Sequence, residues 1–288
     1  MEKVPAYPLT TGDTLRRFRW RLALTYTLTL FETFFELLYP LMIGIAIDGL
    51  ISHRPASLLP IILTWLTHAV LAAARQLYDT RIFARMYQQL AFAVVTHQSK
   101  QGISTSHLAA RSALMREFVD FLEQDVAFVI TITVNFVGAF VLLLLFDVVV
   151  GLYCLLILMP LFFINLLHRR TTRRLNRNLN DQLEKEVEVI ESRQVNTINA
   201  HFVQVARWYI QLSDADARTW FAMQPLLLGL VVLSLIRSVE LNMGIGDIFA
   251  TVGYALSFTD SLHQVPFIVQ QYTRLQDIAD RVNTTDST

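Results

Sequence analysis

Long apolar runs separated by polar segments are the dominant pattern along the chain. A helix needs about 20 predominantly apolar residues to cross the roughly 30 Å hydrocarbon core of a bilayer. Several runs reach this length, such as LALTYTLTLFETFFELLYPLMIGIAI after Arg21 and the run that begins at Leu58. The pattern predicts six membrane-spanning helices at about residues 21–50, 58–92, 117–146, 148–180, 205–236 and 245–270.

Composition supports the same interpretation. Of the 288 residues, 53% are apolar and 17% are charged, whereas a soluble domain usually carries about 25% charged residues. This shortage of charge excludes a disordered chain, a collagen-like chain and an ordinary soluble enzyme. The single cysteine, Cys154, excludes a disulfide scaffold and a cysteine-based zinc site. We expect an all-α membrane protein, a single domain over residues 1–288, without a metal or a cofactor.

The distribution of arginine and lysine predicts the orientation in the membrane. Basic segments precede the first span (LRRFRWR) and follow the fourth (HRRTTRRLNR), whereas the turns after spans one and five hold Arg54 and Arg237. Because basic residues favour the cytoplasmic side, we expect a multi-pass protein with both termini in the cytoplasm, as in a bacterial inner membrane. The first apolar run is too long for a cleavable signal sequence.

The polar connections between spans two and three and between spans four and five also have helical patterns. In the second connection, apolar residues recur on one helical stripe, at Leu175, Leu179, Leu183, Val187 and Ile190. The spans should therefore continue as long amphipathic helices on the cytoplasmic side. Short turns are expected near 99–106 and 195–200.

This arrangement resembles the transmembrane domain of ABC exporters. Three segments carry the resemblance: PLMIGIAIDGL at 40–50, DTRIFARMYQQLAFAVV at 79–95 and LAARSALMREFVDFLEQDV at 108–126. The resemblance implies an ABC-exporter-like, domain-swapped homodimer in which spans four and five reach across to the other protomer. It also implies a central cavity that opens to one side of the membrane at a time.

One departure from the exporter family concerns ATP. In such exporters an ATP-binding domain follows span six, whereas this sequence ends shortly after it and contains no G-x-x-x-x-G-K-[ST] motif. The lysines are Lys3, Lys100 and Lys185, and none of them follows a glycine as a phosphate cradle requires. The sequence resembles the stand-alone subgroup without a nucleotide-binding domain, so we do not expect an enzyme.

Two glutamates of the first span are candidates for proton coupling. Glu32 and Glu36 are four residues apart and therefore share one helix face, with Glu32 near mid-membrane. An ionisable side chain inside a bilayer is costly and indicates function by default. The two carboxylates either exchange protons near neutral pH or simply line a polar cavity. Phe31 and Phe35 beside them either bind an apolar or cationic substrate or face lipid.

Other ionisable residues fall in spans two and six. Asp260 and His263 are three residues apart in span six. They either complete a polar column with the glutamates across the cavity, or pair with each other or with Arg274 at the cytoplasmic interface. Arg75 and Asp79, four residues apart at the inner end of span two, are expected to form a structural ion pair.

The sequence thus predicts a membrane transporter with an ABC-exporter core that works without an ATPase and is coupled to protons. Its expected partners are a second copy of the chain, the lipid bilayer and an unidentified small-molecule or peptide substrate, and not nucleic acid. One alternative is the membrane subunit of a split ABC transporter with a separate ATP-binding subunit. Another is a structural or regulatory membrane protein that does not transport.

Overall fold

The computed structural model describes residues 11–99 and 105–284, and these residues form helices without strands. The prediction of an all-α membrane protein is confirmed. The chain divides into two compact units. The first holds the described residues up to Leu142 and those from Ser238 onward, and the second runs from Leu143 to Arg237.

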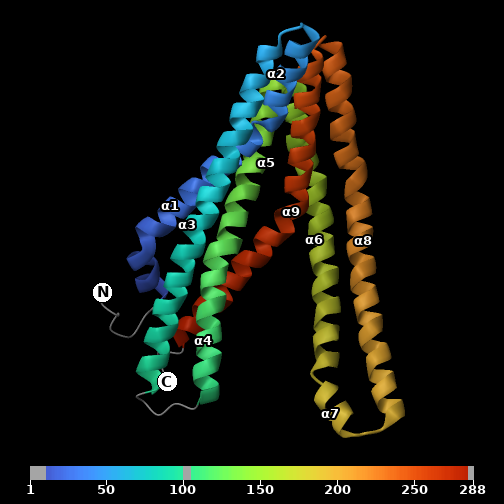
Figure 1. Cartoon of the computed structure of the whole chain (residues 1–288). Coiled ribbons are helices and arrows are strands. Elements are labelled where there is room, and N and C mark those ends of the chain that lie inside the picture. Colours follow the sequence, from blue (N-terminus) through green and yellow to red (C-terminus); the bar gives the residue numbers. More distant parts are fainter. Residues whose placement is uncertain (1–10, 100–104, 285–288) are drawn as a thin grey trace. The chain divides into compact units, whose positions relative to one another are not determined.

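The first unit contains most of the helices (Figure 1). Its core is a cluster of buried apolar side chains from the first two long helices and from the segment that follows them, including Phe18, Phe83, Met86 and Phe118. The elements are α1 (Thr11–Leu37), α2 (Tyr39–Ile51), η1 (Pro55–Ser57), α3 (Leu58–Ser99), α4 (Thr105–Asp120), η2 (Phe121–Asp125), α5 (Val126–Phe146) and α9 (Ile245–Thr284).

The first predicted span is two helices and not one. Helix α1 ends at Leu37 and α2 begins at Tyr39. Pro40 lies in the first turn of α2, where its missing N–H leaves no hydrogen bond unmade. The interruption therefore lies where a proline can begin a helix but cannot continue the preceding one.

Helices α2 and α9 approach each other closely. A Cβ on Gly44 would collide with the backbone of Gly246, so only glycine fits at this crossing. Asp48 of α2 accepts a hydrogen bond of 2.7 Å from the backbone N–H of Gly246, at the start of α9. The I-D-x-L segment therefore fixes the first turn of α9 against α2.

The second unit is a hairpin of two long helices. It contains α6 (Val148–Leu183), α7 (Glu186–Glu191) and most of α8 (Val195–Glu240), and α6 and α8 run side by side in Figure 1. Polar contacts join the two long helices at several levels. They are Asp147 with Arg237 at 2.7 Å, the Tyr153 hydroxyl with the Leu226 carbonyl at 3.3 Å, His168 with Thr219 at 2.9 Å and Gln182 with His201 at 3.0 Å.

Five segments of the described chain are long and apolar enough to cross a membrane. They correspond to the first five predicted spans, and the sixth predicted span lies within α9. The predicted turn at 195–200 is placed too late, because α8 begins at Val195 and the chain turns at 192–194. Most of the predicted turn at 99–106 lies outside the described residues.

Candidate functional site

A network of polar side chains joins α1 to α3. Arg75 of α3 donates to both carboxylate oxygens of Glu32 on α1, through Nε and through Nη2, the latter at 3.3 Å. Its Nη1 lies 3.1 Å from the carboxylate of Asp79, one turn further along α3. Asp79 in turn accepts a hydrogen bond of 2.8 Å from the hydroxyl of Thr25 on α1. One guanidinium is therefore shared by two carboxylates.

The network is largely removed from solvent. The exposed fraction of the side chain is 26% for Arg75, 18% for Glu32 and 7% for Asp79. By helix rise, Arg75 lies about 26 Å from Leu58 at the start of α3, which is close to the full thickness of the hydrocarbon core. Arg75 therefore lies near the inner boundary of the core. Because its side chain is largely buried, its charge needs a partner there, since an unpaired buried charge is strongly destabilising.

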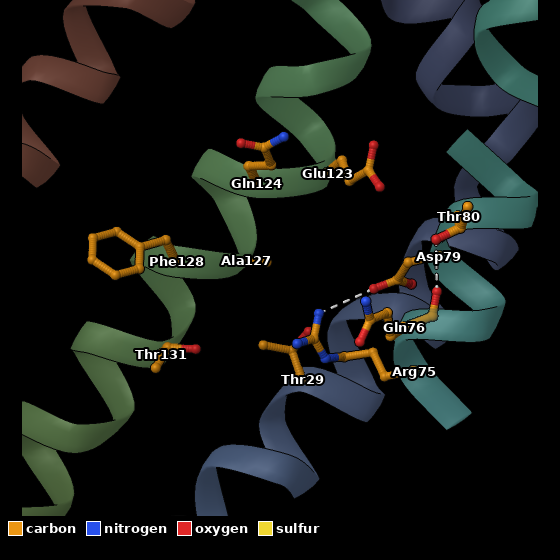
Figure 2. Close-up of a pocket in the computed structure, with 10 residues that line it drawn as sticks. All are labelled: Thr29, Arg75, Gln76, Asp79, Thr80, Glu123, Gln124, Ala127, Phe128 and Thr131. Carbon is orange, nitrogen blue, oxygen red and sulfur yellow. Dashed lines mark hydrogen bonds and ion pairs between the residues drawn. The ribbon is translucent and has the colours of Figure 1, made fainter. Parts of the chain in front are cut away.

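A cavity of about 370 Å³ opens beside the network (Figure 2). Arg75 and Asp79 form part of one wall, and α1 and α5 contribute hydroxyl groups. Glu123 extends from the wall opposite Asp79 and Thr80 in Figure 2. The lining residues are Thr29, Arg75, Gln76, Asp79, Thr80, Glu123, Gln124, Ala127, Phe128 and Thr131.

The charges around the cavity do not balance. Asp79 and Glu123 line the cavity and Glu32 belongs to the adjoining network, so three carboxylates face the one guanidinium of Arg75. Within the described part of the chain, Glu123 forms no ion pair; the neighbouring Arg116 pairs instead with Asp120 at 3.9 Å and lies over the ring of Tyr87. With every carboxylate ionised, the cavity would carry an excess of negative charge.

A π-helical turn positions Glu123. Residues Phe121–Asp125 form the π-helix η2 between α4 and α5. A π-turn adds one residue to the helical repeat and is frequent at functional sites. Phe121 and Leu122 of this turn are buried in the apolar core, while Glu123 and Gln124 reach the cavity. Adjacent residues of this turn can therefore pack in the apolar core and line the cavity.

The two glutamates predicted from the sequence lie in different surroundings. Glu32 is in the network with Arg75, whereas Glu36 is exposed. Phe31 is also exposed, and Phe35 is half-buried. Glu32 is therefore set apart from Glu36 by its bond to Arg75.

The residues proposed for the last span lie on α9. Asp260 is exposed, and His263 is half-buried. The side chain of Arg274, the alternative partner considered for them, lies outside the described residues. The described residues contain no group of three or more His, Cys, Asp or Glu side chains arranged to hold a metal ion.

Several members of the site were not identified from the sequence, Glu123 and Thr25 among them. Glu123 lies just before the most apolar part of span three, where a carboxylate is typical of a membrane interface. Thr25 begins a stripe of threonines spaced four residues apart, Thr25, Thr29 and Thr33, and this spacing was its available signal. A carboxylate within the apolar segment FLEQDVAFV was the only available signal for Glu123.

Comparison with known proteins agrees with the fold. The family described as the ABC transporter transmembrane region matches residues 13–246, which cover α1 through the start of α9. The comparison with curated proteins gives no match. The match spans most of the chain and includes every residue of the polar network and its cavity. The chain therefore belongs to the family of ABC transporter transmembrane regions.

Proposed function

We propose that this membrane transporter component takes up protons at the cavity between α1, α3 and α5, and that proton uptake drives its transport cycle. The observation that carries the proposal is the excess of carboxylates over guanidinium in a largely buried network and the cavity beside it. In a medium of low dielectric constant, uncompensated negative charge is costly, and binding a proton removes that cost.

The connectivity of Arg75 offers a way to couple protons to movement. Its bond to Glu32 links two helices, whereas its bond to Asp79 stays within α3. Protonation of Glu32 would weaken the interhelical bond and leave Arg75 paired with Asp79. The contact between α1 and α3 would then loosen at the level of Arg75 without leaving a buried cation unpaired, while the Thr25–Asp79 bond and the apolar core keep the two helices together. A two-state element of this kind is what a switch requires.

The finer features of the proposal rest on the sequence and the family. We propose that the energy comes from the proton gradient, because the network and its cavity hold more carboxylates than guanidinium. We further propose that the chain works as a homodimer, with a small molecule or a peptide as its substrate. Asp260 and His263 would then assist from α9.

Uptake of a mixture of solutes into membrane vesicles tests this function although the substrate is unidentified. Vesicles containing the protein are incubated in a cell extract with or without an imposed pH gradient, and the accumulated solutes are identified by mass spectrometry. We expect a solute that accumulates only under the gradient. Glu32→Gln should abolish its accumulation, because the neutral side chain cannot change charge.

Glu36→Gln provides the matched control, since Glu36 lies one turn away and is exposed. This variant should transport like the unmodified protein. Unchanged accumulation in the folded Glu32→Gln variant would contradict the proposal. Accumulation that needs ATP and ignores the pH gradient would also contradict it.

The second candidate function is the membrane subunit of a split ABC transporter. The observation in its favour is the tip of the α6–α8 hairpin, where Val187, Ile190 and Val195 are exposed beside glutamates. Exposed apolar residues at the polar end of a membrane protein are typical of a protein interface. Purification in mild detergent distinguishes the two functions, because a stoichiometric ATP-binding subunit should accompany a split transporter.

A further inference from the structure

The outward face of α6 changes abruptly from apolar to basic. Its first part exposes large apolar side chains, and its second part exposes arginines. The exposed apolar residues include Leu152, Leu155, Leu156, Met159, Phe162 and Phe163. The exposed arginines are Arg169, Arg170, Arg173, Arg174 and Arg177.

Both sets lie on the same side of the helix. Successive residues of an α-helix are about 100° apart, so the five arginines fall within an arc of about 140°. The six apolar residues fall within that same arc. The face is therefore one continuous surface that is apolar over one stretch and cationic over the next.

The opposite side of α6 is occupied by the hairpin itself. Leu175 and Leu179 are buried there, and His168 contacts Thr219 of α8 at 2.9 Å. The arginine face thus points away from α8. Within the described residues, none of its arginines forms an ion pair.

The dimensions of the face match those of a bilayer. From Val148 to Arg169, α6 rises about 31 Å, which is close to the thickness of the hydrocarbon core, about 30 Å. The arginines extend over a further length of about 12 Å, enough to span the layer of lipid headgroups. Arginine also pairs with phosphate through two parallel hydrogen bonds.

We propose that the arginine face of α6, Arg169 to Arg177, is a binding surface for the phosphate headgroups of anionic phospholipids, with their acyl chains lying along the adjoining apolar stretch. The occupant is a lipid and not a free phosphate, because the apolar and basic stretches form one surface. This inference is independent of proton coupling, since the face lies on a different unit from the cavity.

Lipid titration followed by native mass spectrometry tests the proposal on the purified full chain. Phosphatidylglycerol is the anionic probe and phosphatidylcholine the neutral reference. Near an anionic surface each arginine contributes about fivefold in affinity. Arg173→Gln should therefore weaken phosphatidylglycerol binding about fivefold, and Arg169→Gln, Arg173→Gln and Arg177→Gln combined should weaken it on the order of a hundredfold.

Arg207→Gln is the matched control, because Arg207 is exposed on α8, in the same hairpin. It should leave the affinity for phosphatidylglycerol unchanged. A lysine triple variant at positions 169, 173 and 177 covers the case in which the glutamine triple fails to insert. The lysine variant keeps the positive charges and loses the bidentate geometry, so it should bind several-fold more weakly than the unmodified protein.

Three results would overturn the proposal. The first is equal affinity for the two lipids. The second is a loss in Arg207→Gln as large as in Arg173→Gln, which would indicate nonspecific surface charge. The third is a glutamine triple that changes the oligomeric state while its lipid affinity stays the same. That result would show that the face packs against a second copy. Inorganic phosphate added as a competitor should not displace the lipid.

Discussion

At the scale of single residues, Arg75 has the most consequential position in the first unit. It is bonded to Glu32 on another helix and to Asp79 on its own. The spacing of four residues predicts the proximity of Arg75 and Asp79. The bond between Arg75 and Glu32 joins residues 43 positions apart, and no local pattern indicates which faces of two helices meet.

Removing Arg75 should destabilise the protein measurably. Arg75→Gln leaves Glu32 and Asp79 with uncompensated charges, and breaking a buried ion pair in this way costs about 3–5 kcal/mol. Because the Arg75 side chain is 26% exposed, water screens part of this cost, and we expect about 2 kcal/mol. Chemical unfolding in detergent micelles measures the loss.

Two further variants define the origin of that loss. Adding Glu32→Gln to Arg75→Gln should restore part of the stability, since it removes one of the unpaired charges. Arg81→Gln, on the exposed side of the same helix, should have little effect. Equal losses in Arg75→Gln and Arg81→Gln would mean that the network contributes nothing to stability.

At the scale of secondary-structure elements, the α6–α8 hairpin shows how polar groups are satisfied beside apolar helices. Asp147 lies between α5 and α6 and is buried. Its Oδ1 accepts a hydrogen bond of 2.8 Å from the Val149 backbone N–H, which caps the N-terminus of α6. Its Oδ2 accepts a hydrogen bond of 2.7 Å from Arg237 at the far end of α8. One carboxylate thus starts one helix and fastens the end of another.

Asp147→Asn and Asp147→Ala should separate these two roles. Asparagine keeps an oxygen for the cap but loses the charge that pairs with Arg237, whereas alanine loses both. We expect alanine to cost about 2 kcal/mol and asparagine about half of that. Hydrogen exchange should show faster exchange in the first turn of α6 in the alanine variant only. Slow exchange there in both variants would show that the cap is not needed.

The sequence predicts where a helix begins and ends better than it predicts local distortions within a helix. The single polar residue between two apolar runs, Asp147, predicts that span three ends at Phe146 and span four begins at Val148, as observed. The π-turn at Phe121–Asp125 has no such signal, because nothing in FLEQD distinguishes it from an α-helical turn. Its geometry depends on packing against α1 and α3, which only the folded chain defines.

At the scale of the whole molecule, membership of the ABC transporter transmembrane family and the membrane-spanning character follow from the pattern of apolar runs. The site could be predicted only in part. An acidic residue in span one pointed to Glu32, but the sequence paired it with Glu36, one helical turn away. The structure gives Glu32 a partner on α3 and leaves Glu36 exposed. Packing between helices, and not spacing along one helix, determines which charged residue lies beside Glu32.

The central claim is that the carboxylates around the cavity take up a proton. Infrared difference spectroscopy of the protein in lipid nanodiscs, with the pH lowered in steps, detects the carbonyl band of a protonated carboxyl group directly and needs no substrate. We predict a titrating band that Glu32→Gln weakens and Glu36→Gln leaves intact, because Glu32 belongs to the polar network beside the cavity and Glu36 is exposed. A band of equal size in both variants, or its absence from the unmodified protein, would contradict proton uptake at this site.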